Sequence, residues 1–250
     1  MKSDIIKSAI KAGLAITAIL IIVIMCITII LQYEKEGEKN IPFQISRITI
    51  VSTAKGIEDT EKEEGESSTW KFDVLQNNDI YFAITKNPNY QKEEMIKNIK
   101  IDNIKLIKEP QIGNIKIYVP SNQEGQKFIY TDEFEITDEI NFVGSERSNE
   151  KDLQIGNQGG NFSISMCNTQ IGKYISNDEE IKHDASLIQK MGKTEEELKF
   201  KVSFDLTIEL ENKKLKTNVI LDMPAENIFA EGTSVKIIND TSSFIFKRVV

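Results

Sequence analysis

The sequence predicts a mainly β protein, in which a single N-terminal transmembrane helix is followed by an antiparallel β-sandwich with at most one or two short helices. Two observations carry this prediction. The first is an uninterrupted run of uncharged, mostly apolar residues from Ala12 to Leu31. The second is a series of segments in which apolar and polar side chains alternate, the pattern of a strand with one buried and one solvated face. The order of these features predicts an anchor followed by a sandwich.

The apolar run has the length of a membrane-spanning helix. At a rise of about 1.5 Å per residue it covers roughly 30 Å, the thickness of the hydrocarbon core of a bilayer. We therefore expect residues 12–33 to contact the lipid bilayer as a signal anchor, with Tyr33 at the boundary where amphipathic rings collect. A cleaved signal peptide has a shorter apolar region and a small-residue cleavage site, and neither is found here.

The basic residues near the run predict its orientation. Lys2, Lys7 and Lys11 precede it, whereas acidic residues and lysines mix after it. Basic flanks stay in the cytoplasm, so residues 1–11 are expected to form a short cytoplasmic tail. Residues 34–40 then form a linker with a reach of about 15 Å on flexible-chain scaling. Residues 41–250 form the extracytoplasmic β domain.

Charge and cysteine content exclude several classes of function. The chain carries 31 basic and 39 acidic residues; the first 32 residues hold three lysines and one aspartate, which leaves 28 against 38 and a net charge of −10 beyond them. Such an acidic domain is not expected to bind nucleic acid, which needs clustered cations. Because Cys26 lies in the span, Cys167 is alone in the domain and cannot form an intramolecular disulfide. In composition and N-terminal sequence the chain resembles signal-anchored surface proteins of low-GC Gram-positive bacteria.

The clearest strands lie near the C-terminus. From Leu198 to Leu210 every second residue is apolar, and the alternation resumes from Leu215 to Leu221 after a polar turn, which predicts a hairpin. Ile99 and Ile101 are followed by Ile104 and Leu106 on the opposite parity, so we expect a bulge near Asp102-Asn103. Other short segments are expected to be strands: residues 70–74, 80–84, 115–119, 128–130, 162–166, 235–237 and 244–246, with a turn at Gln76–Asp79 between the first two. Residues 48–51 are apolar on both faces and are expected to be a strand covered on both sides.

Two segments depart from this pattern. Ser176 and Glu179 have the spacing of a capping box, and apolar residues follow at helical spacing up to Gly192, so residues 177–191 are expected to be a short helix or, alternatively, an extended crossover. The charged run from Glu58 to Ser68 is expected to be a loop. Glycine and polar residues from Gly144 to Gly160 leave open one large sandwich or two immunoglobulin-size ones, over 41–145 and 152–250.

No residue pattern identifies a catalytic, cofactor-binding or metal site. His183 is the only histidine, and Asp184 and Ser186 are too close to it along the chain to converge as a triad. Cys167 follows a stretch unlike the sortase motif, and His183 comes after it rather than before, so the comparison with sortases fails. Cys167 shares parity with Ser163 and Ser165, so we expect it to be half exposed and, without a cationic neighbour, unreactive.

The acidic clusters and the single tryptophan are interpreted as structural. The clusters at Asp132–Glu135, Asp138–Glu139 and Asp178–Glu180 lack the glycine-containing spacing of a calcium loop, which leaves at most weak calcium binding and favours a solvated acidic face. A glycosidase pair of carboxylates has no sequence signature and stays open. Trp70 alternates with Phe72 and Val74 and is expected to lie in the core rather than to bind sugar.

These observations favour a non-enzymatic, membrane-anchored β-sandwich that acts as an interaction or structural module of the cell envelope, with a protein partner close to the membrane. Two alternatives stay open. One is a surface hydrolase that uses two carboxylates on wall or sugar polymer. The other is a ligand-binding subunit of a membrane complex, since residues 1–11 are too short for a signalling domain. The oligomeric state is not predicted.

Overall fold

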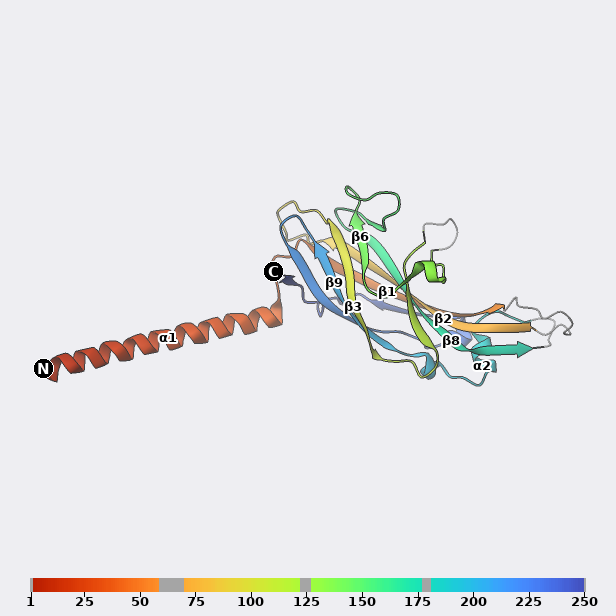
Figure 1. The fold of residues 1–250 in the computed structure, drawn as a ribbon, viewed down its shortest axis with the longest axis horizontal. Helices are drawn as coiled ribbons and strands as arrows, with labels where there is room; N and C mark the ends of the chain where they lie inside the picture. Colours follow the sequence, from red (N-terminus) through yellow and green to blue (C-terminus); the bar gives the residue numbers. More distant parts are fainter. Residues whose placement is uncertain (1, 59–69, 122–126, 177–180, 250) are drawn as a thin grey trace.

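The computed structural model describes residues 2–58, 70–121, 127–176 and 181–249 (Figure 1). A long helix, α1 (Lys2–Glu36), projects from one end of a β-rich domain. Within it, Gly13–Glu36 is long and apolar enough to cross a membrane, and none of its most apolar stretch is buried against the protein. The predicted span is therefore present as a helix, and it continues three residues beyond Tyr33.

The domain consists of two sheets of six strands, which confirms the predicted fold class. Sheet A has the order β11 (Thr233–Ile238), β1 (Phe43–Glu58), β2 (Trp70–Lys86), β8 (Gly160–Ser176), β4 (Asn114–Tyr118), β5 (Glu135–Ile136). Sheet B has the order β12 (Lys247–Val249), β10 (Lys214–Asp222), β9 (Lys201–Glu209), β3 (Asn98–Lys108), β6 (Ile140–Gly144), β7 (Gln154–Ile155). Neighbouring strands are antiparallel except β6 and β7, which are parallel.

One hydrophobic core lies between the sheets and draws on the whole domain. Strands from before and after the 146–151 loop pair directly with one another, since β2 pairs with β8 and β3 with β9. The inward side chains of both sheets form what we call the main core, which includes Phe43, Ile48, Ile50, Ile80, Phe82, Ile99, Phe142, Ile164, Met166, Phe204, Leu206 and Val219. This pairing describes one sandwich, with neither 41–145 nor 152–250 holding a sheet of its own.

A second group of buried apolar residues, the satellite cluster, lies at the far ends of the long strands β1, β2 and β8. Its members include Ala54, Phe72, Val74, Ile171, Leu187, Ile188, Leu198 and Ile228. Along each of these strands a buried polar residue separates it from the main core. These separating residues are Ser52 on β1, Gln76 and Asn78 on β2, and Asn168 on β8, all with no exposed surface.

The predicted turn at Gln76–Asp79 is wrong, because β2 continues through it. Asn78 takes part in the ladder opposite Ser52 and Met166, and its side chain faces the interior. There Asn78 Oδ1 accepts a hydrogen bond from the Ser52 hydroxyl at 2.5 Å, and Asn78 Nδ2 donates to the Met166 carbonyl at 3.0 Å. These partners satisfy the polar groups of the Asn78 side chain, so a strand can pass where local composition predicts a turn.

The structure confirms the predicted bulge in β3 and the predicted hairpin of β9 and β10. The register of β3 against β9 shifts between Asp102 and Lys105, and Asn103 has a positive φ of 55°, which is the expected bulge. The hairpin β9–β10 is present, with Leu210 N donating to Lys213 O across the turn. The strand begins at Lys201 rather than Leu198, since Leu198 ends a 3-10 helix, η2 (Glu195–Leu198).

The predicted helix over 177–191 is much shorter than expected. Residues 177–180 lie outside the described part of the chain, as do residues 59–68 of the predicted charged loop. Helix α2 covers only Ser186–Lys190, and Gly192 follows it with a φ of +74°. Ser176 is the last residue of β8. The capping box of this region is at Thr194, whose side chain pairs with Glu197 at the start of η2. A further short helix, α3 (Ile228–Glu231), joins β10 to β11.

Two other predicted strands are absent. Phe128 forms only an isolated bridge with Pro120, and residues 244–246 precede the short strand β12 rather than forming one. A 3-10 helix, η1 (Asp132–Phe134), follows Tyr130 and leads into β5. The described residues 119–121 and 127–136, called the strap below, therefore cross the sheet as irregular chain that ends in β5.

Residues 34–40, expected to form a linker, contact the C-terminal strand. Glu38 N donates to Phe246 O, and Arg248 N donates to the hydroxyl of Tyr33, both at 2.8 Å. Lys247 forms an ion pair with Glu34. At the bend, Gly37 has a φ of +70°, and a Cβ there would lie 2.5 Å from Phe246 O. Because the chain is hydrogen-bonded on leaving the helix, α1 meets the sandwich as a fixed joint beside the C-terminal strand (Figure 1).

Candidate functional site

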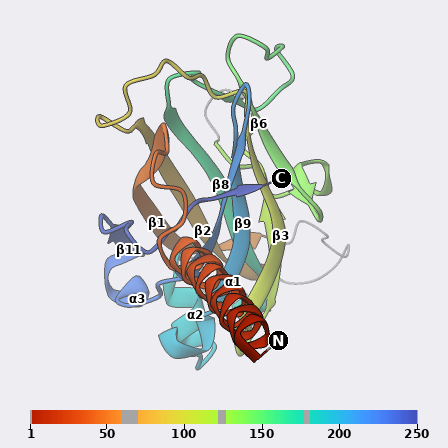
Figure 2. The same ribbon diagram turned by 90° about the vertical axis from the view of Figure 1, so that its left-hand side faces the viewer.

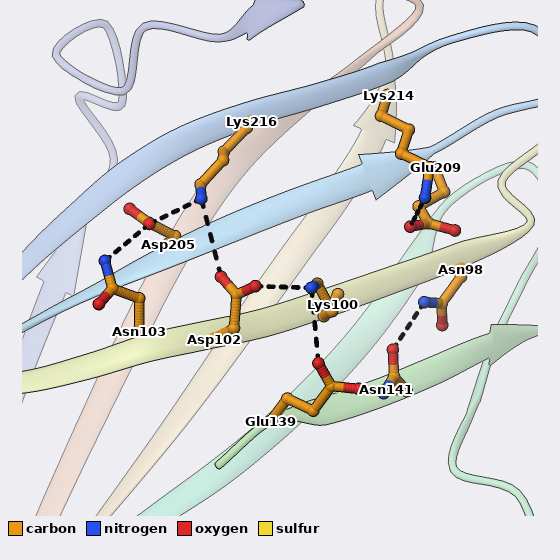
Figure 3. A network of polar contacts seen from close by, with 10 residues as sticks. All are labelled: Asn98, Lys100, Asp102, Asn103, Glu139, Asn141, Asp205, Glu209, Lys214 and Lys216. Atoms are coloured by element: carbon orange, nitrogen blue, oxygen red, sulfur yellow. Dashed lines mark hydrogen bonds and ion pairs between the residues drawn. The ribbon is translucent and has the colours of Figure 1, made fainter. Parts of the chain in front are cut away.

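The outward face of sheet B is a lattice of mutually paired charges (Figure 3). Lys216 Nζ lies 2.8 Å from Asp205 and 3.9 Å from Asp102, and Lys100 lies 2.6 Å from Asp102 and 3.5 Å from Glu139. Amide groups extend the pattern, as Asn98 donates to Asn141 at 2.8 Å. Each of these charges already has a partner of opposite sign. Such a surface suits solvation more than the binding of an apolar partner.

The outward face of sheet A is different, because the strap covers part of it. The row that runs across the sheet through Val51 and Asp79 continues to Ser165 on β8 and Tyr118 on β4. Tyr130 of the strap packs edge-on against Tyr118, with ring centroids 5.1 Å apart. Leu75, Tyr118 and Cys167 are buried beneath it, and Phe134 packs against them. The strap therefore buries a small hydrophobic cluster on part of the outward face of sheet A.

A half-buried carboxylate, Asp79, lies at the margin of this covered region. Its Oδ1 accepts hydrogen bonds from the Ser165 hydroxyl at 2.7 Å and the Tyr130 hydroxyl at 3.3 Å. Burial raises the pKa of Asp79 above its usual value, against the opposing effect of these two donors and of Lys127 and Lys55. The neighbours that shift this pKa are hydroxyls and lysines, with no second carboxylate among them in the described part of the chain.

Cys167 is fully buried, so the expectation of a half-exposed thiol is wrong. It points to the outward side of sheet A as its parity predicts, but the strap covers that side. Its thiol donates to Asn77 Oδ1 at 3.3 Å, and burial is the main cause that raises its pKa to about 12. A thiol that stays protonated at neutral pH is a poor nucleophile.

The structure does not bring His183, Asp184 and Ser186 together as a triad. The His183 ring is exposed and packs edge-on against Phe72, with centroids 4.5 Å apart. Asp184 Oδ1 accepts from the Ser186 backbone N–H at 2.9 Å at the start of α2. The Ser186 side chain and then its backbone hold the pKa of Asp184 below its usual value. These contacts give Asp184 a structural role at the helix start and leave His183 in an aromatic packing contact.

The acidic clusters are dispersed over the surface. Glu135 pairs with Lys116 at 2.6 Å, and Asp132 lies 3.6 Å from the same lysine. Glu139 joins the charge lattice of sheet B, whereas Asp178–Glu180 lie outside the described part of the chain. Among the described residues, no group of three or more His, Cys, Asp or Glu side chains could hold a metal ion.

Trp70 is half-buried and stacks on Phe72, with centroids 6.5 Å apart and an interplanar angle of 12°. It packs against the satellite cluster. Trp70 therefore lies at the margin of the core rather than within it, where the sequence-based expectation places it.

An exposed apolar strip lies on the outward side of sheet A at its β11 edge. Val235 and Ile237 on β11 are 55% and 56% exposed and point outward beside Val51 and Thr49. In the described part of the chain no strand lies beyond β11, so its outer backbone edge has no ladder partner (Figure 2). Natural edge strands are usually protected by outward lysines, by bulges or by being very short. Another edge strand, β12, follows that rule: it is three residues long and reads Lys-Arg-Val.

Sequence reasoning missed both features of the sheet A face for identifiable reasons. The polar run Gln76-Asn77-Asn78-Asp79 looks like a turn, yet residues 72 to 84 keep a single parity, and that continuity was the available signal. The exposure of Val235 and Ile237 had no signal, because alternation alone does not tell which face of a strand is covered.

Comparison of the chain with protein-family models, with curated proteins and with solved structures finds no match in any of the three. The geometry of the two sheet faces is therefore what bears on function.

Proposed function

We propose that this protein is a membrane-anchored, non-enzymatic binding module that takes an extended segment of a protein partner along the edge strand β11. The observation that carries the proposal is the open edge of β11 with Val235 and Ile237 exposed beside it. An added strand gains main-chain hydrogen bonds from such an edge, and alternate side chains supply the specificity.

The contrast between the two sheets supports this choice of surface. Much of the outward face of sheet B carries paired charges, and its edge strand β12 is short and basic. On β11 the one lysine, Lys236, turns toward Asp222 of sheet B, where its Nζ donates to the Asp222 carbonyl at 3.3 Å. Lys236 therefore does not protect the outer face of β11, which keeps an apolar strip suited to a partner.

The anchor places this edge near a bilayer. On our proposal α1 crosses the cell membrane with residues 1–11 in the cytoplasm and the sandwich outside, in line with the basic residues before the span. The fixed joint between α1 and the C-terminal strand limits the reach of the domain. Partners are accordingly expected to be proteins held at the same membrane surface.

Site-specific photo-crosslinking in cells tests the proposal. A photoreactive amino acid at Ile237 should give one discrete adduct, and Val235→Lys should reduce its yield by about tenfold, since a charge buried against an apolar partner is costly unless it is paired. The matched control is Ile220, which is 48% exposed on the outward face of sheet B. Equal adducts from positions 220 and 237, or an adduct from 237 that is indifferent to Val235→Lys, would rule out docking on β11.

A further inference from the structure

A cavity of about 290 Å³ opens beside the edge of β11 and is lined by four lysines. Val235 and Lys236 contribute to it from β11, and Asp222 and Met223 contribute from the end of β10. The cavity thus lies between the edge of sheet A and the corner of sheet B, on the same side of the sandwich as the proposed docking edge. A strand added to β11 would pass along its mouth. Its lining includes Lys108, Lys199, Phe200, Lys201, Pro224 and Glu226.

The charges that line this cavity do not balance. Asp222 lies 3.2 Å from Lys201 and 3.9 Å from Lys236, and Glu226 lies 2.8 Å from Lys199, which also pairs with Glu196 outside the lining. Two carboxylates of the lining therefore form ion pairs with three of its lysines. The fourth, Lys108, forms no ion pair with any residue that the structure describes. This local excess of cations stands out in a chain whose net charge is −8. An anionic group placed here would meet complementary charge instead of the repulsion expected elsewhere on the domain.

We propose that the partner segment on β11 alternates apolar with acidic side chains, and that its acidic side chains enter this lysine-lined cavity. The inference rests on the proposed function. Successive side chains of a strand point to opposite faces, so apolar residues beside Val235 and Ile237 alternate with residues on the side of Lys236. The first set meets the apolar strip, and the second set meets Lys236, Lys108 and Lys201. Charge complementarity thus selects the chemistry of the occupant.

Peptide binding to the full-length protein in lipid nanodiscs tests this pattern. The probe is a short, capped, fluorescent peptide that alternates valine with glutamate, compared with the same peptide carrying glutamine in place of glutamate. We expect the glutamate peptide to bind about tenfold more tightly at low salt, because partly exposed ion pairs contribute up to about 1 kcal/mol each. The combined substitutions Lys108→Gln and Lys236→Gln should remove that difference and leave the affinity for the glutamine peptide unchanged.

The controls separate this inference from the proposal on which it rests. Lys92→Gln with Lys151→Gln removes two exposed lysines away from the cavity and should leave the preference for glutamate intact. Equal binding of the two peptides to the unaltered protein would overturn the acidic pattern while docking on β11 stands. If neither peptide binds, and Val235→Lys has no effect on cellular crosslinking either, both proposals fall. A thermal unfolding transition within about 2–3 °C of the parent, which corresponds to a ΔΔG below about 1 kcal/mol, confirms that each lysine variant is folded.

Discussion

Sheet A and sheet B have the same number of strands but place their polar groups differently. Sheet B keeps its charges outward, paired and in water (Figure 3). Sheet A buries polar side chains on both faces, with Asn78 and Ser52 inward and Cys167 and Ser165 outward beneath the strap. A buried polar group is costly when it loses its partner, whereas an exposed one returns to water. Substitutions that look alike in sequence should therefore differ in effect between the two sheets.

The largest expected effect is that of Asn78→Ala. It leaves the Met166 carbonyl and the Ser52 hydroxyl without their partner in the interior, and we expect a loss of about 2–3 kcal/mol in the free energy of unfolding. Asn141→Ala, at an exposed amide pair on sheet B, is the matched control and should cost less than about 0.5 kcal/mol. Thermal unfolding of the full chain in detergent compares them. Equal losses would mean that burial does not distinguish the sheets.

Tyr130→Phe should have an intermediate effect, centred on the strap. It removes the hydroxyl that donates to Asp79, at a cost of about 1 kcal/mol, and should loosen the cover over Cys167. Labelling of Cys167 by a thiol reagent should then be about fivefold faster, since labelling reports opening of the cover. Cys26 is replaced by serine in all variants. Tyr90→Phe, whose hydroxyl donates to Glu94, should leave the rate unchanged. An unchanged rate in Tyr130→Phe would show that its hydroxyl does not hold the strap.

The smallest expected effect is on the pH dependence of stability, measured with substitutions of two aspartates. Burial raises the pKa of Asp79, so ionising it costs stability as pH rises through that pKa, and Asp79→Asn should be more stable than the parent at pH 7. Burial alone would also raise the pKa of Asp205, but the ion pair with Lys216 and the amides of Asn218 and Asn103 hold it below its usual value. Its charge contributes stability at pH values above 3.8, the usual pKa of an aspartate, so Asp205→Asn should be less stable at pH 7.

Both differences should shrink as the pH falls. The gain in Asp79→Asn should vanish by pH 3.8, where the carboxyl of the parent is protonated in the fold, and the loss in Asp205→Asn should vanish only below that pH. Unfolding temperatures measured from about pH 7 down to about pH 3.5 supply the comparison. Effects of the same sign for the two variants would contradict the assigned environments.

The features that the sequence could predict are those with a local signal. The span follows from the length of its apolar run, the β9–β10 hairpin from unbroken alternation, and the bulge at Asp102-Asn103 from a change of parity. The β-rich class follows from the repetition of such segments. None of these needs knowledge of distant contacts.

The features that could not be predicted depend on residues far apart in the chain. Gln76–Asp79 stays extended because Ser52 and Met166 supply partners across two strand pairings. Cys167 is buried because a strap from another part of the chain crosses it. The candidate site on β11 depends on which strand ends the sheet, which alternation within β11 does not encode.

The three longest strands also determine how far the domain extends from its anchor. β1, β2 and β8 have 16, 17 and 17 residues and run through both apolar groups without a break in the chain. At about 3.3 Å per residue, such a strand spans at most ~55 Å. With α1 fixed to the opposite end, these strands act as a spacer of nearly constant length. If α1 spans a membrane as we propose, the end of the domain that carries α2 would stand at a set height above the membrane surface.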